Sequence, residues 1–336
     1  MTLQAVSGRP RAQSADGAYP QAQRRPTLSV IVPVKDEEQA IRSFLARTVP
    51  ILDRLRGVTS WEIIFIDDGS TDGTLPNLII ASSGDDRIKI LSLSRNFGKE
   101  AALSAGLDHA SGAAVIPIDV DMQDPPEAIV DLVARWQEGY EVVYGVRNDR
   151  LSDSHAKRLS SALFYKFHNF ISEDQIPENA GDFRLLDRSV VEVIKQLPER
   201  NRFMKGIFAW SGFRQSSIEY AREPRAVGKT KYSYLKLLRL ALDGITSSST
   251  VPLRIWSYVG GVIALLAFLY AAFIVLETML FGSSVNGYPS IITAIMFLGG
   301  IQLISLGVLG EYVGRILIET KQRPLYVLRT SIGVEK

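Results

Sequence analysis

Residues 28–68 read LSVIVPVKDEEQAIRSFLARTVPILDRLRGVTSWEIIFIDD. Leu28–Val34 and Glu62–Asp67 are short runs rich in β-branched residues, as is typical of strands, and Glu37–Leu55 between them reads as a helix. A strand, a helix and a second strand in this order predict a βαβ unit, in which the two strands lie parallel in one sheet.

The same alternation continues to about Tyr144. The further expected strands are Lys89–Leu93, Ala114–Ile118 and Glu141–Tyr144, and the further expected helices are Thr71–Ala81, Lys99–Ala110 and Pro126–Glu138. This pattern predicts an α/β, Rossmann-like domain with a mostly parallel sheet covered on both faces. Ligands bind such open sheets beyond the carboxyl ends of the strands, so functional residues are expected there.

The composition excludes several classes of protein. A net charge of +2 in a chain of 336 residues that is 22% charged argues against a nucleic-acid partner. The absence of cysteine excludes disulfides, thiolate metal sites and cysteine nucleophiles. Three histidines, at positions 109, 155 and 168, argue against a histidine-rich metal site.

Two carboxylates follow the expected strand Ala114–Ile118. The segment 118–126 reads IDVDMQDPP, and we expect Asp119 and Asp121 to emerge on the same side of the backbone. Such a pair favours Mg²⁺ or Mn²⁺ bound together with substrate phosphates. A D-x-D pair also arises by chance, but its place after a strand favours the metal site.

A second acidic pair, Asp67 and Asp68, follows the strand residues Glu62–Ile66. Carboxylates in this position can accept hydrogen bonds from the ribose or base of a nucleotide. The neighbouring Ser70, Thr71 and Asp72 suit a turn and a helix cap instead.

Two segments near the C-terminus predict transmembrane helices. Ile255–Leu276 and Tyr288–Gly310 contain no charged residue over 22 and 23 positions, which is long enough to cross a bilayer. The alternative, two buried helices of a soluble core, needs more surrounding protein than the chain has left. Lys and Arg flank the pair, whereas the link 282–287 has neither, which predicts a multi-pass protein of the cytoplasmic membrane with the catalytic domain and both termini in the cytoplasm.

Apolar residues recur at helical spacing before the first span, from Tyr234 to Ile245, with Lys236 and Arg239 among them. They predict an amphipathic helix in the membrane interface, or else a helix that packs on the soluble domain. The expected organisation is a disordered tail at 1–26, a catalytic domain at 27–228, an interfacial helix region at 229–250, a transmembrane hairpin at 251–318 and a cytoplasmic tail at 319–336.

Four motifs together carry a family resemblance. They are SVIVPVKDEE at 29–38, DDGS at 67–70, SRNFGK at 94–99 and DVDMQD at 119–124. In this order they resemble the family 2 glycosyltransferases, which have a GT-A fold, and more narrowly the polyprenyl-phosphate hexosyltransferases, meaning the bactoprenol glucosyltransferase and dolichyl-phosphate mannose synthase group. The resemblance covers residues 27–325, although Val120 and Met122 depart from the residues more common in that group.

The resemblance implies inverting transfer of a hexose from a nucleotide-sugar to a polyisoprenyl phosphate, for modification of lipopolysaccharide or another cell-surface glycan. UDP-glucose is the preferred donor and GDP-mannose the alternative. It also implies a divalent metal and suggests a homo-oligomer. By this resemblance Pro33 and Glu37 lie near the nucleotide, and Asp119, Asp121 and Gln123 bind the metal and the donor diphosphate.

The resemblance also assigns Asp182, in the segment GDFR at 181–184, as the candidate catalytic carboxylate. A phosphate monoester is mostly dianionic at pH 7 and is already a competent nucleophile. Asp182 therefore acts either as a base or as a positioning group, and capping of the next segment is the structural alternative.

An anionic acceptor requires cations. Arg200, Arg202, Arg225 and Lys231 are the candidate ligands of the lipid phosphate, because arginine grips phosphate oxygens in pairs and lysine acts as a point charge. Their alternative role is general attraction to anionic lipid.

Two other functions compete with this one. A processive polysaccharide synthase would share the sheet, but the chain has no Q-x-x-R-W motif. A non-catalytic membrane scaffold would not require the intact acidic set.

Overall fold

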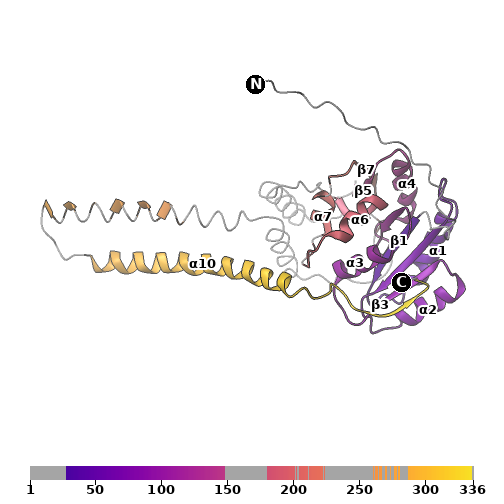
Figure 1. The fold of residues 1–336 in the computed structure, drawn as a ribbon, viewed down its shortest axis with the longest axis horizontal. Coiled ribbons are helices and arrows are strands. Elements are labelled where there is room, and N and C mark those ends of the chain that lie inside the picture. The colour runs from indigo at the N-terminus through magenta and orange to yellow at the C-terminus, as the bar shows by residue number, and fades with distance from the viewer. Residues whose placement is uncertain are drawn as a thin grey trace, which may run out of the picture.

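A computed structural model describes residues 28–147, 180–200, 202, 204–210, 212–221, 223, part of the positions between 260 and 280, and 287–334. In this structure an α/β domain carries a long helix, α10 (Tyr288–Thr320), that projects away from it (Figure 1).

Eight strands within the described residues form one sheet in the order β7-β5-β6-β4-β1-β2-β3-β8. β1 pairs in parallel with β2 and β4, β2 with β3, and β5 with β7, whereas β6 and β8 run antiparallel to their neighbours. The predicted mostly parallel α/β sheet is therefore confirmed. The strands are β1 (Leu28–Val34), β2 (Trp61–Asp67), β3 (Ile88–Leu93), β4 (Ala114–Pro117), β5 (Val142–Arg147), β6 (Ala180–Asp187), β7 (Gln215–Tyr220) and β8 (Leu328–Ile332).

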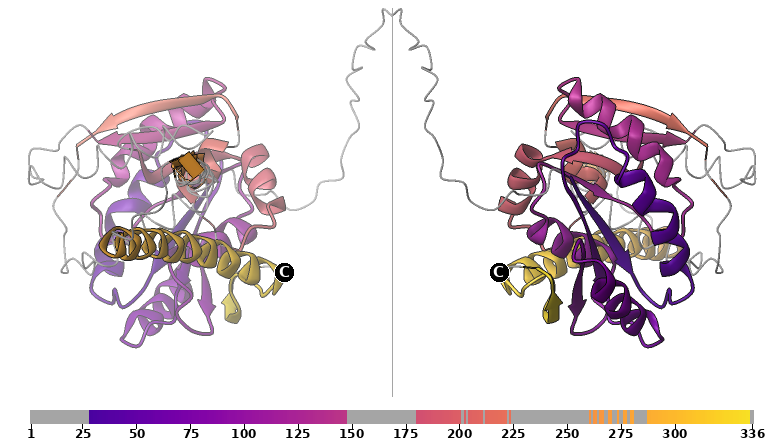
Figure 2. Two further views of the ribbon diagram at one scale, coloured as in Figure 1. Left: turned by 90° about the vertical axis from the view of Figure 1, so that its left-hand side faces the viewer. Right: turned by 90° about the vertical axis from the view of Figure 1, so that its right-hand side faces the viewer.

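Helices cover both faces of this sheet, as its buried strands require (Figure 2). In β1 the alternation of side chains sends Val30 and Val32 into one hydrophobic cluster and Ile31 into the other. The first cluster includes α1 (Ala40–Leu52), α2 (Thr74–Gly84), the 3₁₀ turn η1 (Pro126–Ala128) and α4 (Ile129–Gln137). The second includes α3 (Lys99–His109), α6 (Arg188–Gln196) and α7 (Met204–Trp210).

Two local features differ from the expected ones. The helix expected from Glu37 begins at Ala40, because Asp36 has a positive φ of 52° and turns the chain after β1. β4 ends at Pro117, so Asp119 and Asp121 lie in a turn beyond the strand, where Met122 also has a positive φ of 55°. The two carboxylates therefore do not share a strand face as we expected.

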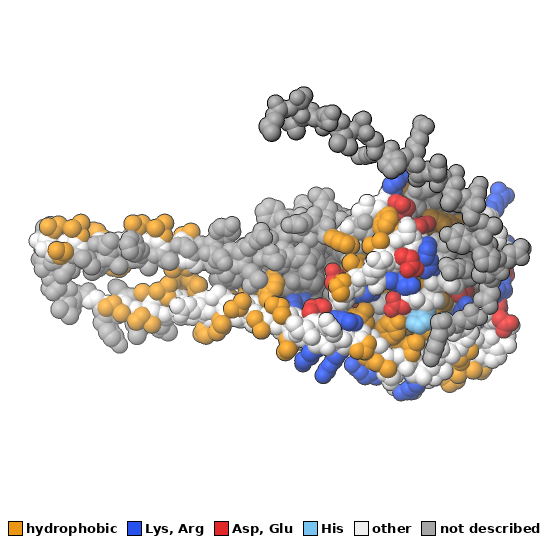
Figure 3. All heavy atoms as spheres, in the orientation of Figure 1, with side chains coloured by type: hydrophobic (Ala, Val, Ile, Leu, Met, Phe, Trp, Pro, Cys, Tyr) orange, Lys and Arg blue, Asp and Glu red, His pale blue; other side chains and the backbone are white. Residues whose placement is uncertain are grey.

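α10 is the one helix within the described residues that is long and apolar enough to cross a membrane, over Phe297–Thr320 with a mean hydropathy of 1.5. Its apolar side chains are exposed along its length, and Lys and Arg side chains gather where it meets the domain (Figure 3). It continues past Gly310, where we expected the span to end. The other expected span, Ile255–Leu276, is described only in part, and its described positions are helical.

The chain returns to the sheet after α10. β8 pairs antiparallel with β3, in the segment 319–336 that we expected as a tail. Tyr326 donates a hydrogen bond to Asp108 of α3 at 2.8 Å, and Arg329 donates one to the carbonyl of Ser94 at 2.9 Å. The last described segment is thus part of the α/β domain.

Candidate active site

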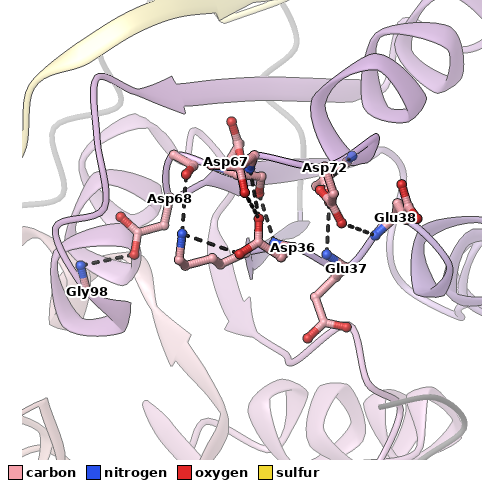
Figure 4. Close-up of polar contacts among 12 residues, drawn as sticks. Asp36, Glu37, Glu38, Asp67, Asp68, Asp72 and Gly98 are labelled. Carbon is pink, nitrogen blue, oxygen red and sulfur yellow. Dashed lines mark hydrogen bonds and ion pairs between the residues drawn. The ribbon is translucent and has the colours of Figure 1, made fainter. Parts of the chain in front are cut away.

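Loops at the carboxyl ends of β1, β2 and β3 form the first half of the site (Figure 4). Lys35 follows β1, and its ammonium donates to the carbonyl of Gly69 at 3.3 Å. Asp36 accepts from the backbone N–H of Thr71 at 2.8 Å and pairs with Lys35. The N–H of Glu37 donates to the hydroxyl of Thr74 at 2.9 Å. The loop after β1 is therefore fastened to the β2 loop, while Pro33 lies inside β1, beside Ile66 of β2.

The two carboxylates that end β2 have different surroundings. Asp67 is buried and accepts from the N–H of Ser70 at 2.9 Å and from the hydroxyl of Ser92 at 3.0 Å. Through these contacts Asp67 stabilises the loop that follows β2. Asp68 accepts from the N–H groups of Phe97 at 2.7 Å and Gly98 at 3.0 Å.

Burial raises the pKa of Asp68 above its ordinary value, although the two N–H groups act in the opposite direction. Through these two hydrogen bonds Asp68 connects the segment DDGS at 67–70 to the segment SRNFGK at 94–99. These contacts hold the loops after β1, β2 and β3 against one another, and the donor-binding roles of Pro33, Glu37, Asp67 and Asp68 stay predictions.

The second half of the site is a small pocket between α3, β4 and β6. Lys99, Asp119, Asp124 and Asp182 line it together with apolar side chains. β6 runs antiparallel to β4, so the start of β6, with Asp182, meets the end of β4, with Asp119. The candidate catalytic carboxylate and the first acid of the D-x-D pair thereby lie in one pocket.

Lys99 bridges these two carboxylates. Its ammonium lies 2.7 and 2.8 Å from the two oxygens of Asp119 and 3.0 Å from Asp182. Burial acts to lower the pKa of Lys99, but the charges of Asp119 and Asp182 outweigh it and raise that pKa well above its ordinary value. Lys99 is therefore a permanent cation of the pocket.

Asp121 and Gln123 occupy the turn beside the pocket. The N–H of Gln123 donates to Asp121 at 3.1 Å, and its carbonyl accepts from the N–H of Glu223 at 3.1 Å. Arg47 of α1 holds Glu223 with two hydrogen bonds of 2.7 Å and also pairs with Glu127. The chain that leaves β7 is thus tied to the D-x-D turn.

Carboxylates are hard oxygen ligands suited to Mg²⁺ or Mn²⁺. The described residues contain no group of three or more acidic, histidine or cysteine side chains placed to hold a metal by themselves. A site with Asp119 and Asp121 fits a metal that takes its remaining ligands from substrate phosphates and water, which is the usual arrangement for Mg²⁺.

The predicted lipid-phosphate ligands are placed only in part. The backbone N–H of Arg200 donates to Glu319 at the end of α10, at 2.9 and 3.0 Å. Arg202 is half-buried and donates to Ser104 at 3.2 Å and to the carbonyl of Leu197 at 3.0 Å. Arg225 and Lys231 lie outside the described residues.

Lys99 and Asp124 were not among the predicted site residues. Asp124 is buried and accepts a hydrogen bond from the hydroxyl of Tyr220. Lys99 ends the motif SRNFGK and Asp124 ends the motif DVDMQD, but neither motif by itself indicated a role for them. Their place in the pocket depends on β6 and β7, which periodicity did not reveal.

Comparison with known proteins agrees with this geometry. Residues 29–195 match the model of glycosyl transferase family 2, and residues 251–316 match that of the GtrB C-terminal hairpin. The prophage bactoprenol glucosyl transferase homolog of Escherichia coli is 52% identical over 302 residues, covering 90% of this chain and 98% of the relative.

The bactoprenol glucosyl transferase of Shigella phage SfV is also 52% identical, over 304 residues, with 90% and 98% of the two chains covered. An uncharacterized glycosyltransferase of Synechocystis is 51% identical over 308 residues, with 92% and 96% covered. The chain therefore belongs to glycosyl transferase family 2, groups within it with the bactoprenol glucosyl transferases, and is a glycosyltransferase.

Proposed function

We propose that this enzyme transfers one hexose, with glucose from UDP-glucose as the first choice and mannose from GDP-mannose as the second, to a polyisoprenyl phosphate. The observation that carries the proposal is the pocket that joins Asp119 to Asp182, in a chain half identical over nine-tenths of its length to bactoprenol glucosyl transferases. Asp68, Glu37 and the loop after Pro33 would hold the nucleotide.

The acceptor phosphate supplies its own nucleophile, because its oxygens are mostly ionised at neutral pH. A metal held by Asp119, Asp121 and Gln123 would offset the charge that develops on the departing diphosphate. Asp182 faces the same pocket and is placed either to take a proton or to orient the sugar. Its ion pair with Lys99 favours orientation, since a carboxylate held by a cation is a weaker proton acceptor.

The membrane part of the proposal is a two-helix hairpin over 251–318 that keeps the catalytic domain on the cytoplasmic face. The match to the GtrB C-terminal hairpin and the exposed apolar surface of α10 support it. Arg200, Arg225 and Lys231 would meet the lipid phosphate near this surface, preceded by an interfacial helix at 229–250.

The test is transfer of label into lipid. Purified protein in detergent is incubated with undecaprenyl phosphate, Mn²⁺ or Mg²⁺ and single radiolabelled UDP- or GDP-sugars, and the organic phase is extracted. We expect label from one donor to enter that phase and to disappear when EDTA removes the metal. Labelled polymer would instead indicate a processive synthase, and donor binding without transfer to lipid would indicate a scaffold.

Replacement of the second D-x-D acid tests the metal assignment. We expect Asp121→Ala to lower the transfer rate by about 100-fold or more, because several kcal/mol of charge stabilisation depend on the metal. Asp131→Ala, on the exposed face of α4, is the matched control and should transfer at the wild-type rate. Wild-type transfer by Asp121→Ala would remove this residue from the metal site.

A further inference from the structure

The position of Lys99 is unusual for a lysine. It is the first residue of α3, directly after Gly98, whose φ of 101° turns the chain into the helix. The positive end of a helix dipole disfavours a cation at this position. Helix stability therefore does not explain Lys99, and the contacts that hold its ammonium are those to Asp119 and Asp182.

The charges in the pocket are unequal. Asp119, Asp124 and Asp182 line it, whereas Lys99 is its one cation among the described residues that line it. Asp124 accepts a hydrogen bond from Tyr220, whereas Asp119 and Asp182 pair directly with Lys99. Because the pocket has three carboxylates and one ammonium, it attracts a further cation when Lys99 moves away from Asp119 or Asp182.

Lys99 and a metal would compete for Asp119. Both oxygens of Asp119 lie within hydrogen-bond distance of the ammonium, at 2.7 and 2.8 Å. A divalent ion bound to the same oxygens would lie against the ammonium and be repelled by it. Metal binding at Asp119 therefore competes with Lys99, whose side chain is one-third exposed.

We propose that Lys99 is a built-in counter-cation that occupies Asp119 until a metal bound to the donor diphosphate displaces it, after which Asp182 retains it. This inference rests on the proposed function in assigning Asp119 to the metal. Lys99 is then a positioning residue, and it makes metal binding weak unless the donor adds its own ligands.

The test is binding of Mn²⁺ alone, by titration calorimetry of the full chain in detergent with no donor or acceptor present. We expect Lys99→Gln to bind Mn²⁺ roughly three- to tenfold more tightly than wild type, after discounting for the exposed part of the side chain. Lys99→Arg keeps the cation and should bind Mn²⁺ with nearly wild-type affinity. Lys195→Gln, which removes a half-buried lysine of α6 that pairs with Glu192, is the matched control and should have no effect.

Equal or weaker Mn²⁺ binding by Lys99→Gln, with wild-type thermal unfolding, would overturn the proposal and leave Lys99 as an ordinary ion-pair partner. If the glutamine variant does not fold, Lys99→Met, which is uncharged and of similar length, decides by the same measurement. The experiment contains no acceptor, so its outcome is independent of whether label enters lipid in the transfer assay.

Discussion

Glu62 is a buried carboxylate near the amino end of β2, whereas the candidate site lies at the carboxyl ends of the strands. It stands near the start of β2, where it accepts from the hydroxyl of Ser29 at 2.5 Å and from Ser111, and pairs with Lys89 at 2.6 Å. Burial acts to raise its pKa, but the bonds from Lys89, Ser29 and Ser111 outweigh burial and lower it. Glu62 therefore contributes stability as an ionised group.

We expect Glu62→Gln to lower the free energy of unfolding at pH 7 by about 1–3 kcal/mol, because one ionic partner of a buried network is lost. A lowered pKa means that the stability is present above the unfolded pKa of about 4.5 and is lost as pH falls through the folded value. Thermal unfolding of the full chain in detergent at pH 7 and at pH 4 should show the difference from wild type shrinking at the lower pH. A difference that stays constant or grows would contradict this account.

Arg200 and Arg202 are predicted to bind the same lipid phosphate, but their surroundings differ. Arg202→Ala removes hydrogen bonds to Ser104 and Leu197, so we expect loss of about 1–3 kcal/mol of stability. Arg200→Ala keeps its backbone bond to Glu319, so we expect little change in unfolding and a higher KM for the acceptor. The free energy of unfolding and the KM for the acceptor are measured in both variants. A destabilised Arg200→Ala together with a stable Arg202→Ala of raised KM would mean that the two roles are exchanged.

At the scale of elements, β8 is the strand whose contribution can be isolated. It covers the outer edge of β3, whose Leu91 and Leu93 are buried. We expect deletion of residues 323–336 to lower the unfolding temperature and to speed proteolysis, since the β3 edge loses its partner. Tyr326→Phe, which loses only the bond to Asp108, should cost about 1 kcal/mol. Equal unfolding of the truncated and full chains would contradict a structural role for β8.

The sequence predicted β1 to β5 and the helices among them. Each of these strands contains a run of β-branched residues, and the stretches between them have the residue pattern of helices. β6, β7 and β8 escaped prediction because their places depend on pairing between distant segments. The same reason explains the site. The motifs marked Asp68, Asp119 and Asp182, but contact of Lys99 with Asp182 requires β6 to run antiparallel beside β4, which no local pattern encodes.

For the whole molecule, the exposed apolar surface of α10 has a measurable consequence. Leu303 is 72% exposed within the candidate span Phe297–Thr320. An arginine at the centre of a span costs about 2.5–3.5 kcal/mol of insertion free energy, which is the upper limit for a position such as 303 nearer one end. We therefore expect Leu303→Arg to lower the fraction of the protein that stays in membranes after alkaline carbonate extraction, and Leu303→Ile to leave it unchanged. Equal retention of the two variants would argue against α10 as a span.

The order of β8 and α10 along the chain also governs how the enzyme is made. β8 leaves the ribosome only after α10 has been synthesised, so the sheet stays incomplete throughout translation of α10. During that interval β3 presents an open edge that can pair with other nascent chains. Under the proposed membrane placement, slow insertion of α10 prolongs an aggregation-prone state of the catalytic domain, and chaperone demand should rise with that delay.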